Sequence, residues 1–395
     1  MRQIDLKRAS VARVDTIRNI NRQIVLNYIR ERAPISRAEI SYETALQRST
    51  VSLIVDELKT QGLVDELEGE STGGRPPVLL RLRTAGSVAM GVDLGIAHTV
   101  VATSDLAGRL LHQQSFTTSA NAKKTLQNII DAARELIRKE KGIEGIGISV
   151  PGLVDHKSGR VHFIPHFKWR DWTLAEEVRK ATGVPVRVDN DANAGSLAEL
   201  WFGRPEIRET RDFIFVLVEE GIGTGIVFDG QVYHGEGGAA GEFGHMTIGT
   251  DAPVACAVGT RECWEAFASE RAALARYRAM AGRSTSGVSF QQLVERALGG
   301  EQAAREALLE TAHYLGVGIA NVLKALSPSA VIVGGAIARA WPLISERLKT
   351  AVEENTVCRG LPSARIVAST LGENPRIMGA LSLVLAGKFA SPVTS

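Results

Sequence analysis

The sequence predicts a small α+β head followed by two α/β lobes, with divisions at residues 1–85, 86–205 and 206–395. Within the head, three stretches of helical periodicity precede two short apolar runs. Beyond the head, apolar runs typical of buried strands alternate with helical patterns to the end of the chain. Two glycine-containing hairpins, Asp93–Gly95 and Gly221–Gly225, lie about 130 residues apart, which indicates an internal duplication. We expect a ligand in a cleft between two such lobes.

The composition is that of an ordinary globular protein of 395 residues, with a net charge of +2 and a mean hydropathy of +0.01. No run of about 18 apolar residues is present, so we expect no transmembrane helix. The N-terminal segment lacks the apolar stretch of a secretory signal. Three cysteines do not make a disulfide framework in a chain of this length. We therefore expect a cytoplasmic protein without a membrane partner.

Charge is unevenly distributed along the chain. Residues 1–50 hold ten Arg and Lys side chains, nine of them Arg, against five Asp and Glu. A basic segment on a near-neutral body suggests contact with nucleic acid, although a solvated basic face would give the same count.

The head has the sequence pattern of three helices. Apolar residues at helical spacing predict a first helix over about residues 16–32. Ser36–Glu39 is a capping box, which predicts the start of a second helix. After a break at 44–46, a third helix ends at Gly62, a residue type that commonly follows helices. The predicted buried stripe of the third helix consists of Val51, Ile54, Val55 and Leu58.

The other face of the third helix carries short polar and arginine side chains that suit base edges and phosphates in a major groove. Strands at 63–67 and 78–82 flank a Gly- and Pro-rich wing at 70–77, whose arginine can enter a narrow minor groove. Three helices followed by a wing is the order of a winged helix-turn-helix domain, which predicts double-stranded DNA as a partner. A three-helix bundle that binds a protein is the alternative. The predicted DNA-binding residues are Arg37, Gln47, Arg48, Ser49, Thr50, Ser52 and Arg75.

The second glycine hairpin follows an apolar run at 213–218 that is typical of a buried strand. Glycines at a spacing of two let backbone N–H groups approach a phosphate, although a plain tight turn is the simpler explanation. Glu219 and Glu220 enter the hairpin, and two carboxylates repel a phosphate. We interpret the segment as a phosphate hairpin that no longer holds a nucleotide.

A carboxylate, a histidine and two cysteines follow this hairpin. Glu242 can accept hydrogen bonds from sugar hydroxyls, and the imidazole of His245 can bind a metal or a ligand. A lone histidine is usually a satisfied core or surface residue. Cys256 and Cys263 downstream, however, add two more side chains of a type that binds metal.

These motifs resemble the ROK family of repressors, open reading frames and kinases. In that family Glu-x-Gly-His precedes Cys-x-Cys-Gly-x-x-Gly-Cys-x-Glu, and the His and three Cys hold a structural zinc. Here Val258 replaces the middle Cys and Glu262 replaces the second Gly. The resemblance therefore implies a zinc site with three protein ligands, namely His245, Cys256 and Cys263. Water or a neighbouring carboxylate would be the fourth ligand, and a metal-free loop held by packing is the alternative.

The first glycine hairpin departs from the same family pattern. In actin-like sugar kinases it reads Asp-x-Gly-Gly-Thr and contacts metal and phosphate. Asp93 and Gly95 remain here, but Ile96 and Ala97 stand where the kinases have Gly and Thr. An isoleucine side chain blocks the close backbone approach of a phosphate, so we expect neither a bound nucleotide nor kinase activity.

The resemblance also assigns a sugar site. In the kinases, the Asp that matches Asp191 is the general base on a sugar hydroxyl, and the Asn that matches Asn190 binds the sugar. Binding a hydroxyl needs the same geometry without a phosphate donor, so Asp191 is interpreted as a vestigial base. The N-cap of the following helix is its structural alternative. The predicted sugar-binding residues are Asn190, Asp191, Glu242, His245 and Glu265.

The resemblance covers head and body together. Segments 33–39 and 73–77 look like the head of ROK-family repressors, which the sugar kinases of the family lack. It implies a winged helix-turn-helix head followed by two actin-like, ribonuclease H-like lobes of the hexokinase superfamily, with the last helix, 376–388, returning to the first lobe. The implied function is repression that responds to a sugar. A homodimer or homotetramer would bind operator DNA, and a monosaccharide or a derivative would be the effector.

Two other functions fit the sequence. An ATP-dependent sugar kinase with an accessory DNA-binding head is supported by Asp191 and the Glu-x-Gly-His motif, and opposed by the changes in both hairpins. A repressor whose body binds a protein partner in place of a sugar is the other.

Overall fold

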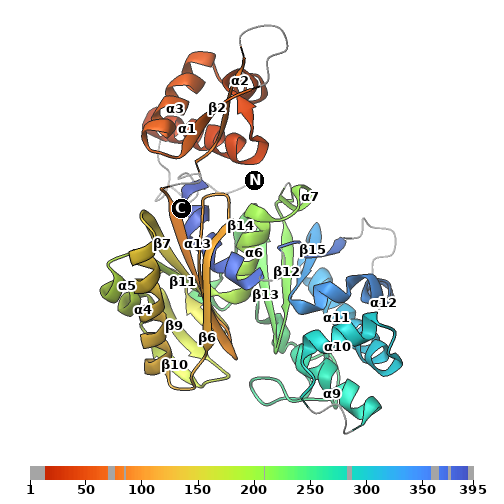
Figure 1. Ribbon diagram of the computed structural model, residues 1–395. Helices are drawn as coiled ribbons and strands as arrows, with labels where there is room; N and C mark the ends of the chain where they lie inside the picture. Colours follow the sequence, from red (N-terminus) through yellow and green to blue (C-terminus); the bar gives the residue numbers. More distant parts are fainter. Residues whose placement is uncertain are drawn as a thin grey trace.

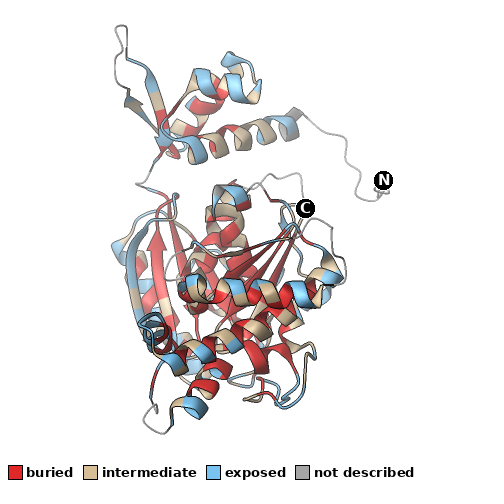
Figure 2. Ribbon diagram, turned by 90° about the vertical axis from the view of Figure 1, so that its right-hand side faces the viewer, coloured by how far each residue is buried: buried red, intermediate tan, exposed pale blue. Residues whose placement is uncertain are grey.

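The computed structural model describes residues 14–69, 76–83, 86–208, 210–282, 287–356, 364–371 and 375–389. Figure 1 shows a small head above a body in which two lobes, each built on a β-sheet, lie side by side. Figure 2 shows that buried residues gather in the sheets and on the inner faces of the helices, with a smaller buried centre in the head. Within the described ranges, no helix is long and apolar enough to cross a bilayer.

The head contains α1 (Val14–Arg32), α2 (Arg37–Thr44), α3 (Arg48–Thr60) and a sheet of order β1-β3-β2 (Ile35–Ser36, Val78–Leu82, Val64–Glu68). The predicted capping box is confirmed, because Ser36 Oγ accepts from Glu39 N at 3.2 Å and Glu39 Oε2 accepts from Ser36 N at 2.8 Å. The stripe predicted on the third helix is buried along its whole length. The predicted wing tip, including Arg75, lies outside the described residues.

The first lobe has a five-stranded sheet of order β11-β7-β4-β5-β6. Its strands are β4 (Val88–Leu94), β5 (His98–Ser104), β6 (Leu110–Thr117), β7 (Ile143–Val150) and β11 (Val186–Asn190). Helices α4 (Ala122–Lys139) and α5 (Leu174–Thr182) pack on one face, where Met90, Val92 and Leu94 are buried. A smaller sheet joins β8 (Leu153–Asp155), β9 (Arg160–Ile164) and β10 (Trp169–Trp172).

The second lobe repeats this topology. Its sheet has the order β14-β13-β12-β15-β16. Counted from β6 in the first lobe and from β14 in the second, two antiparallel pairings are followed by two parallel ones. The predicted duplication is therefore confirmed. The strands are β12 (Phe213–Val218), β13 (Ile222–Phe228), β14 (Gln231–Val232), β15 (Ala330–Gly334) and β16 (Arg365–Ala368). The helices are α7 (Pro205–Arg208), α8 (Trp264–Ala268), α9 (Glu270–Ala281), α10 (Phe290–Leu298), α11 (Gln302–Leu326) and α12 (Trp341–Asn355), with short 3₁₀ turns η1 (Glu236–Gly238), η2 (Glu242–His245) and η4 (Ala336–Ala340).

Two helices pack side by side at the centre of the body, α6 (Asp191–Phe202) and α13 (Pro375–Phe389). Although α13 follows the second lobe in sequence, it packs on β4 and β7 of the first. A Cβ at Gly147 of β7 would lie only 1.9 Å from the carbonyl oxygen of Ala380. The helix therefore rests directly on the strand, and only glycine leaves room for this approach.

Candidate functional site

An arginine of the last helix joins the two lobes. Arg376 Nε lies 3.1 Å from Asp93 Oδ2, and Arg376 Nη1 lies 2.7 Å from Glu219 Oε2. Asp93 belongs to β4 of the first lobe, whereas Glu219 opens the β12–β13 turn of the second. Half-buried Asp191, at the start of α6, also interacts with the charge of Arg376. We refer to Asp93, Asp191, Glu219 and Arg376 as the interlobe cluster.

Burial is the main influence on the carboxyl groups of this cluster. It raises the pKa of Asp191 to about 7 and that of Glu219 to about 8, while the positive charge of Arg376 opposes both shifts. Nearby Glu270 is affected in the same way, and its pKa rises to about 9. For Arg376, burial disfavours the charge, but the surrounding carboxylates hold its pKa above the ordinary value. Arg376 therefore stays positively charged, whereas the neighbouring carboxyl groups of Glu219 and Glu270 stay largely protonated near neutral pH.

Both glycine hairpins converge on Arg376. A Cβ at Gly95 would lie 3.1 Å from Arg376 Nη2, so the first hairpin touches the same guanidinium that is bonded to Glu219 of the second. Ile96 and Ala97 form the tip of the first hairpin, half-buried and exposed respectively. The guanidinium of Arg376 thus lies in contact with both hairpins. Sequence reasoning missed Arg376, because a single arginine at the start of an apolar helix does not reveal its partners.

Asn190 and Asp191 lie where β11 ends and α6 begins. The prediction that Asp191 could be the N-cap is wrong, because Asn190 is the N-cap and its Oδ1 accepts from Ala192 N at 2.9 Å and Asn193 N at 3.2 Å. Asn190 Nδ2 also donates to Gly152 O at 3.1 Å. The amide of Asn190 therefore shapes the turn, and Asp191 is the first helical residue, with its carboxyl group beside the β13 backbone at Gly223.

The start of β13 brings the remaining predicted residues together. Ile222 N donates to Glu265 Oε2 at 3.2 Å, and Thr224 Oγ1 bonds the carbonyl of Gly241, which precedes η2. Glu242 and His245 lie on η2. Strand β13 therefore has Asp191, Glu265 and the turn that carries Glu242 and His245 as its neighbours. The other oxygen of Glu265 accepts from Ala257 N at 2.7 Å, so Glu265 is buried and also braces the cysteine loop. Glu242 stays largely exposed.

His245, Cys256 and Cys263 form a compact group, with one potential ligand atom of each within 4.8 Å of the others. His245 Nε2 lies 3.9 Å from Glu242 Oε2, while its Nδ1 is buried and has no hydrogen-bond partner. An unpartnered buried imidazole nitrogen beside two thiols fits a zinc ion, which prefers such donors. Val258 is 56% exposed, and among the described residues no fourth His, Cys, Asp or Glu joins the group.

The two thiols differ in acidity. Burial raises the pKa of Cys256, but hydrogen bonds with Thr260 and Cys263 outweigh it and lower that pKa to about 7. Burial raises the pKa of Cys263. Cys256 Sγ lies 3.1 Å from Thr260 Oγ1. At least one thiol is therefore ready to lose its proton, as a metal ligand must.

A second contact between the lobes was not predicted. His234, between β14 and η1, lies 2.8 Å from Asp189 Oδ2 of β11 through its Nε2 atom. The ring of His156 stacks on His234 with centroids 3.6 Å apart. A cavity of about 360 Å³ adjoins this group, and its lining includes His156 and Asp189 but none of the predicted sugar-binding residues. The sequence held no spacing signal, because the three residues come from separate segments.

In the head, Gln47, Arg48 and Ser49 are exposed at the start of α3, and Thr50 and Ser52 are half-buried. Arg37 differs from them, because its guanidinium contacts Asp56 Oδ1 at 2.7 Å and Glu66 Oε1 at 2.9 Å. It therefore ties α2 to α3 and β2. Two exposed apolar residues were not singled out from the sequence, Tyr42 on α2 (87% exposed) and Leu53 on α3 (73%).

Comparison with known proteins agrees with this architecture. The model of the ROK family matches residues 89–386. A xylose repressor from Bacillus spizizenii is 32% identical over 375 residues, an alignment that covers 93% of this chain and 96% of that protein. The crystal structure of a ROK family transcriptional regulator, a homologue of the Escherichia coli MLC protein, superposes with a TM-score of 0.78 at 26% identity. It covers 95% of this chain and 97% of that one.

A kinase is also similar, but only to the body. The ROK family glucokinase of Streptomyces griseus, solved with glucose and AMPPNP, is 29% identical with a TM-score of 0.69. The match covers all of the glucokinase but only 76% of this chain. With a family match over most of the body and a relative that aligns over nearly its whole length, the chain belongs to the ROK family.

Proposed function

We propose that this protein is a transcriptional repressor that responds to a sugar. The head binds operator DNA as a winged helix-turn-helix domain, and a monosaccharide or a derivative binds between the lobes. The observation that carries the proposal is the pair of ion pairs by which Arg376 joins Asp93 of the first glycine hairpin to Glu219 of the second. A sugar-kinase body whose hairpins hold an internal ion pair can keep its sugar site after losing its nucleotide.

For the head, the exposed start of α3 is the DNA-contacting surface. Gln47, Arg48 and Ser49 are free of the core there, and Arg48 has the planar fork that suits guanine edges and phosphates. Thr50 and Ser52 would contribute shorter contacts, Arg75 would contact the minor groove, and Arg37 would hold the helices in position. Operators read by such heads contain two half-sites, so a homodimer or homotetramer is expected.

For the sugar, Asp191 is the central group. Its raised pKa lets the carboxyl group donate or accept a hydrogen bond near neutral pH, which suits a hydroxyl that is bound and not deprotonated. Glu242 and His245 would contact the ligand from η2, while Asn190 and Glu265 hold the surrounding backbone.

For the metal, we propose a zinc ion on His245, Cys256 and Cys263. The buried Nδ1 atom of His245 would bind it, leaving Nε2 free for Glu242 and the sugar. Water would take the fourth position, because Val258 offers no ligand. When bound, zinc supplies a cross-link between η2 and the cysteine loop.

Fluorescence anisotropy on the DNA upstream of the protein's own gene, at fixed salt and with a panel of unmodified sugars, tests the proposal. We expect specific binding that one sugar weakens in the absence of ATP. Specific binding that no sugar changes would favour control by a protein partner. If the protein instead shows no specific DNA binding and phosphorylates a sugar in a coupled ATP assay, it is a kinase. The similarity of the body to the glucokinase is the reason for this second assay.

A further inference from the structure

Two helices run from the interlobe cluster to the DNA-binding head. The N-terminal ends of α6 and α13 carry Asp191 and Arg376, and their C-terminal ends carry Trp201 and Phe389. A helix of the length of α13, 15 residues, spans about 22 Å. The C-terminal end of α13 contacts α1 of the head. Each helix therefore has one end in the proposed sugar site and the other at the base of the head.

The head is bonded to both helix ends through α1. Asn27 Nδ2 donates to the carbonyl oxygen of Phe389 at 2.9 Å, an interaction between residues 362 positions apart. The guanidinium carbon of Arg30 lies 4.7 Å from the centroid of the Trp201 ring and 4.9 Å from that of the Phe389 ring. Cation–π contacts of this kind are directional and strengthen when they are shielded from water. The Arg30 side chain is only 8% exposed.

The contact between head and body is part of a continuous core. Val25, Leu26 and Ile29 of α1 belong to the same cluster of buried residues as Leu385 and Phe389 of α13. Arg30 adds its cation–π contacts on top of this apolar packing. The head therefore packs on the C-terminal ends of α6 and α13. A displacement of either end would change the contacts of α1.

The two helices are packed closely on each other. A Cβ at Gly379 would lie 2.9 Å from the backbone carbon of Ala194, so the helix backbones touch without a side chain between them. Close-packed surfaces of this kind have few intermediate arrangements, and a small shift is passed on as a rigid-body movement. In contrast, the cluster at the other end is held by ion pairs, whose geometry depends on the charges and ligands nearby.

We propose that α6 and α13 act as one coupling unit between the sugar site and the head. Binding of an uncharged sugar at Asp191 changes the contacts that hold Arg376 between Asp93 and Glu219. The paired helices shift as a body, and Trp201 and Phe389 carry the shift to Arg30 and Asn27 of α1. This inference rests on the proposed function and specifies how its site is regulated. Arg30 and Arg376 are positioning residues at the two ends of the unit.

The test is the thermodynamic coupling between sugar and DNA, measured on the full chain. Operator affinity is determined by anisotropy with and without the active sugar of the panel, and sugar affinity by calorimetry with and without the upstream DNA. Wild-type protein should show the same coupling factor in both experiments, about tenfold or more. Arg30→Leu, which keeps the apolar stem and removes the cation, should bind sugar within about twofold of wild type while the coupling factor falls towards one.

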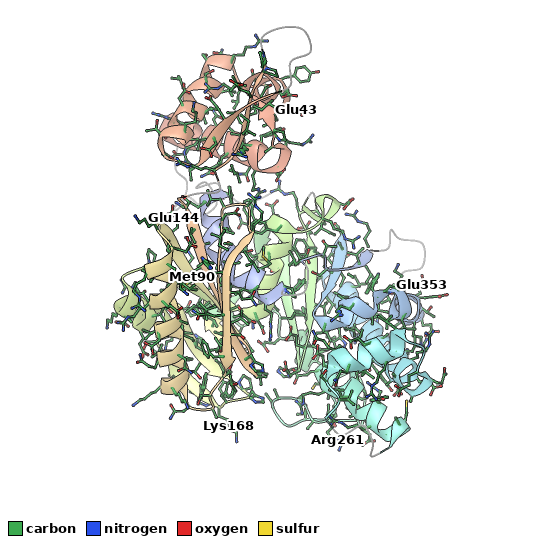
Figure 3. All side chains as sticks on the ribbon, in the orientation of Figure 1. Glu43, Met90, Glu144, Lys168, Arg261 and Glu353 are labelled. Carbon is green, nitrogen blue, oxygen red and sulfur yellow. The ribbon has the colours of Figure 1, made fainter. Side chains whose placement is uncertain are left out.

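Lys388→Gln is the matched control. Lys388 lies on the same helix, and its ion pair with Glu144 at 2.8 Å, which the substitution removes, is made with the first lobe and not with the head or the interlobe cluster. Figure 3 labels Glu144 at the end of the first lobe that is nearest to the head. This control should keep the wild-type coupling factor. Asn27→Ala is the second variant, in case Arg30→Leu abolishes DNA binding outright.

Hydrogen exchange of the α1 amides, with and without sugar, gives a readout that does not need DNA. Protection should change on sugar binding in wild type and Lys388→Gln, and stay constant in Arg30→Leu. Wild-type coupling in both Arg30→Leu and Asn27→Ala, or α1 exchange that sugar leaves unchanged in wild type, would overturn the inference. A wild-type protein that binds no sugar would instead refute the proposed function, so the two failures can be told apart.

Discussion

Arg376 Nη1 lies 2.7 Å from Glu219 Oε2, which bonds the last helix of the chain to the turn of the second glycine hairpin. In sequence terms Glu219 is a residue that repels phosphate. In the folded chain it is also the acceptor of an ion pair between the lobes, and Asp93 of the first lobe is the other acceptor of the same guanidinium. One arginine thus forms ion pairs with both hairpins.

Removal of the Arg376 guanidinium should destabilise the protein, because Asp93 and Glu219 then lose their positively charged partner. We expect Arg376→Met to lower the free energy of unfolding by about 2 kcal/mol at pH 8.5, because breaking partly buried ion pairs leaves carboxylates without a partner. At pH 5.5 the loss should be smaller, since Asp191 and Glu219, with pKa values of about 7 and 8, can then be protonated. Urea denaturation at the two pH values measures both numbers. Arg376→Lys, which keeps the charge, is the control, and equal losses for Arg376→Met at both pH values would contradict the prediction.

The stability of the wild-type protein should fall as the pH rises from 7 to 9. Glu219 and Glu270 have pKa values raised to about 8 and 9, so the native state holds protons that the unfolded chain has already released. The protonated side chains of Glu219 and Glu270 therefore contribute their full stability below the ordinary glutamate pKa. This contribution decreases as the pH rises and is lost once the pH passes the raised native-state pKa of each group. Glu219→Gln should make the free energy of unfolding, measured by urea denaturation, fall less steeply between pH 7 and 8, by up to about 1.4 kcal/mol per pH unit. Parallel profiles for the variant and the wild type would show that Glu219 does not titrate in this range.

Asp191→Ala should abolish the response to sugar and leave operator binding intact. The carboxyl group of Asp191 lies at the start of α6, far along the helix from the contacts of the head. Calorimetry with the active sugar, and anisotropy on the upstream DNA, measure the two properties separately. Glu135→Ala, an exposed substitution on α4, should change neither. Induction that persists in Asp191→Ala would remove Asp191 from the sugar site.

The purified protein should contain one zinc ion per chain, measured by elemental analysis after gel filtration. Cys263→Ala should reduce zinc content to near zero, because only two protein ligands would remain. Val258→Cys should instead slow the release of zinc to a chelator, since it adds a thiolate where a fourth ligand is lacking. Full zinc content in Cys263→Ala, or a release rate that Val258→Cys leaves unchanged, would place the metal elsewhere.

Arg37 and Arg48 should behave differently although both were predicted to contact DNA. Arg48→Ala should weaken operator binding and reduce its salt dependence by about one counterion, with no change in melting temperature. Arg37→Ala should lower the stability of the head by about 1 kcal/mol, because it removes two ion pairs of a half-buried guanidinium, one with exposed Asp56 and one with half-buried Glu66. Salt titrations and thermal melts of the two variants separate the roles. Unchanged binding in Arg48→Ala would move the DNA contact away from the start of α3.

Local elements of the fold could be predicted because short-range physics decides them. Ser36 and Glu39 form their capping box from neighbours three positions apart, and Val51, Ile54, Val55 and Leu58 are buried because their spacing places them on one helix face. The two hairpins were found in the same way, and their matching sheet orders follow from the repeated pattern. The grouping of His245, Cys256 and Cys263 came from the resemblance to the family, and the structure brings their ligand atoms together.

By itself, the sequence determined which two hairpins have the glycine pattern of phosphate-binding turns. It also determined which residues within them, such as Ile96 and Glu219, are unfavourable for phosphate, because these residues are part of the hairpins themselves. Only the tertiary structure decided that Arg376 forms ion pairs with both hairpins, and that Arg30 of the head packs on Trp201 and Phe389. Such contacts join segments 157 to 359 residues apart, as with Glu219 to Arg376 and Arg30 to Phe389. Their formation depends on how α13 packs back on the first lobe, and no local pattern encodes that return.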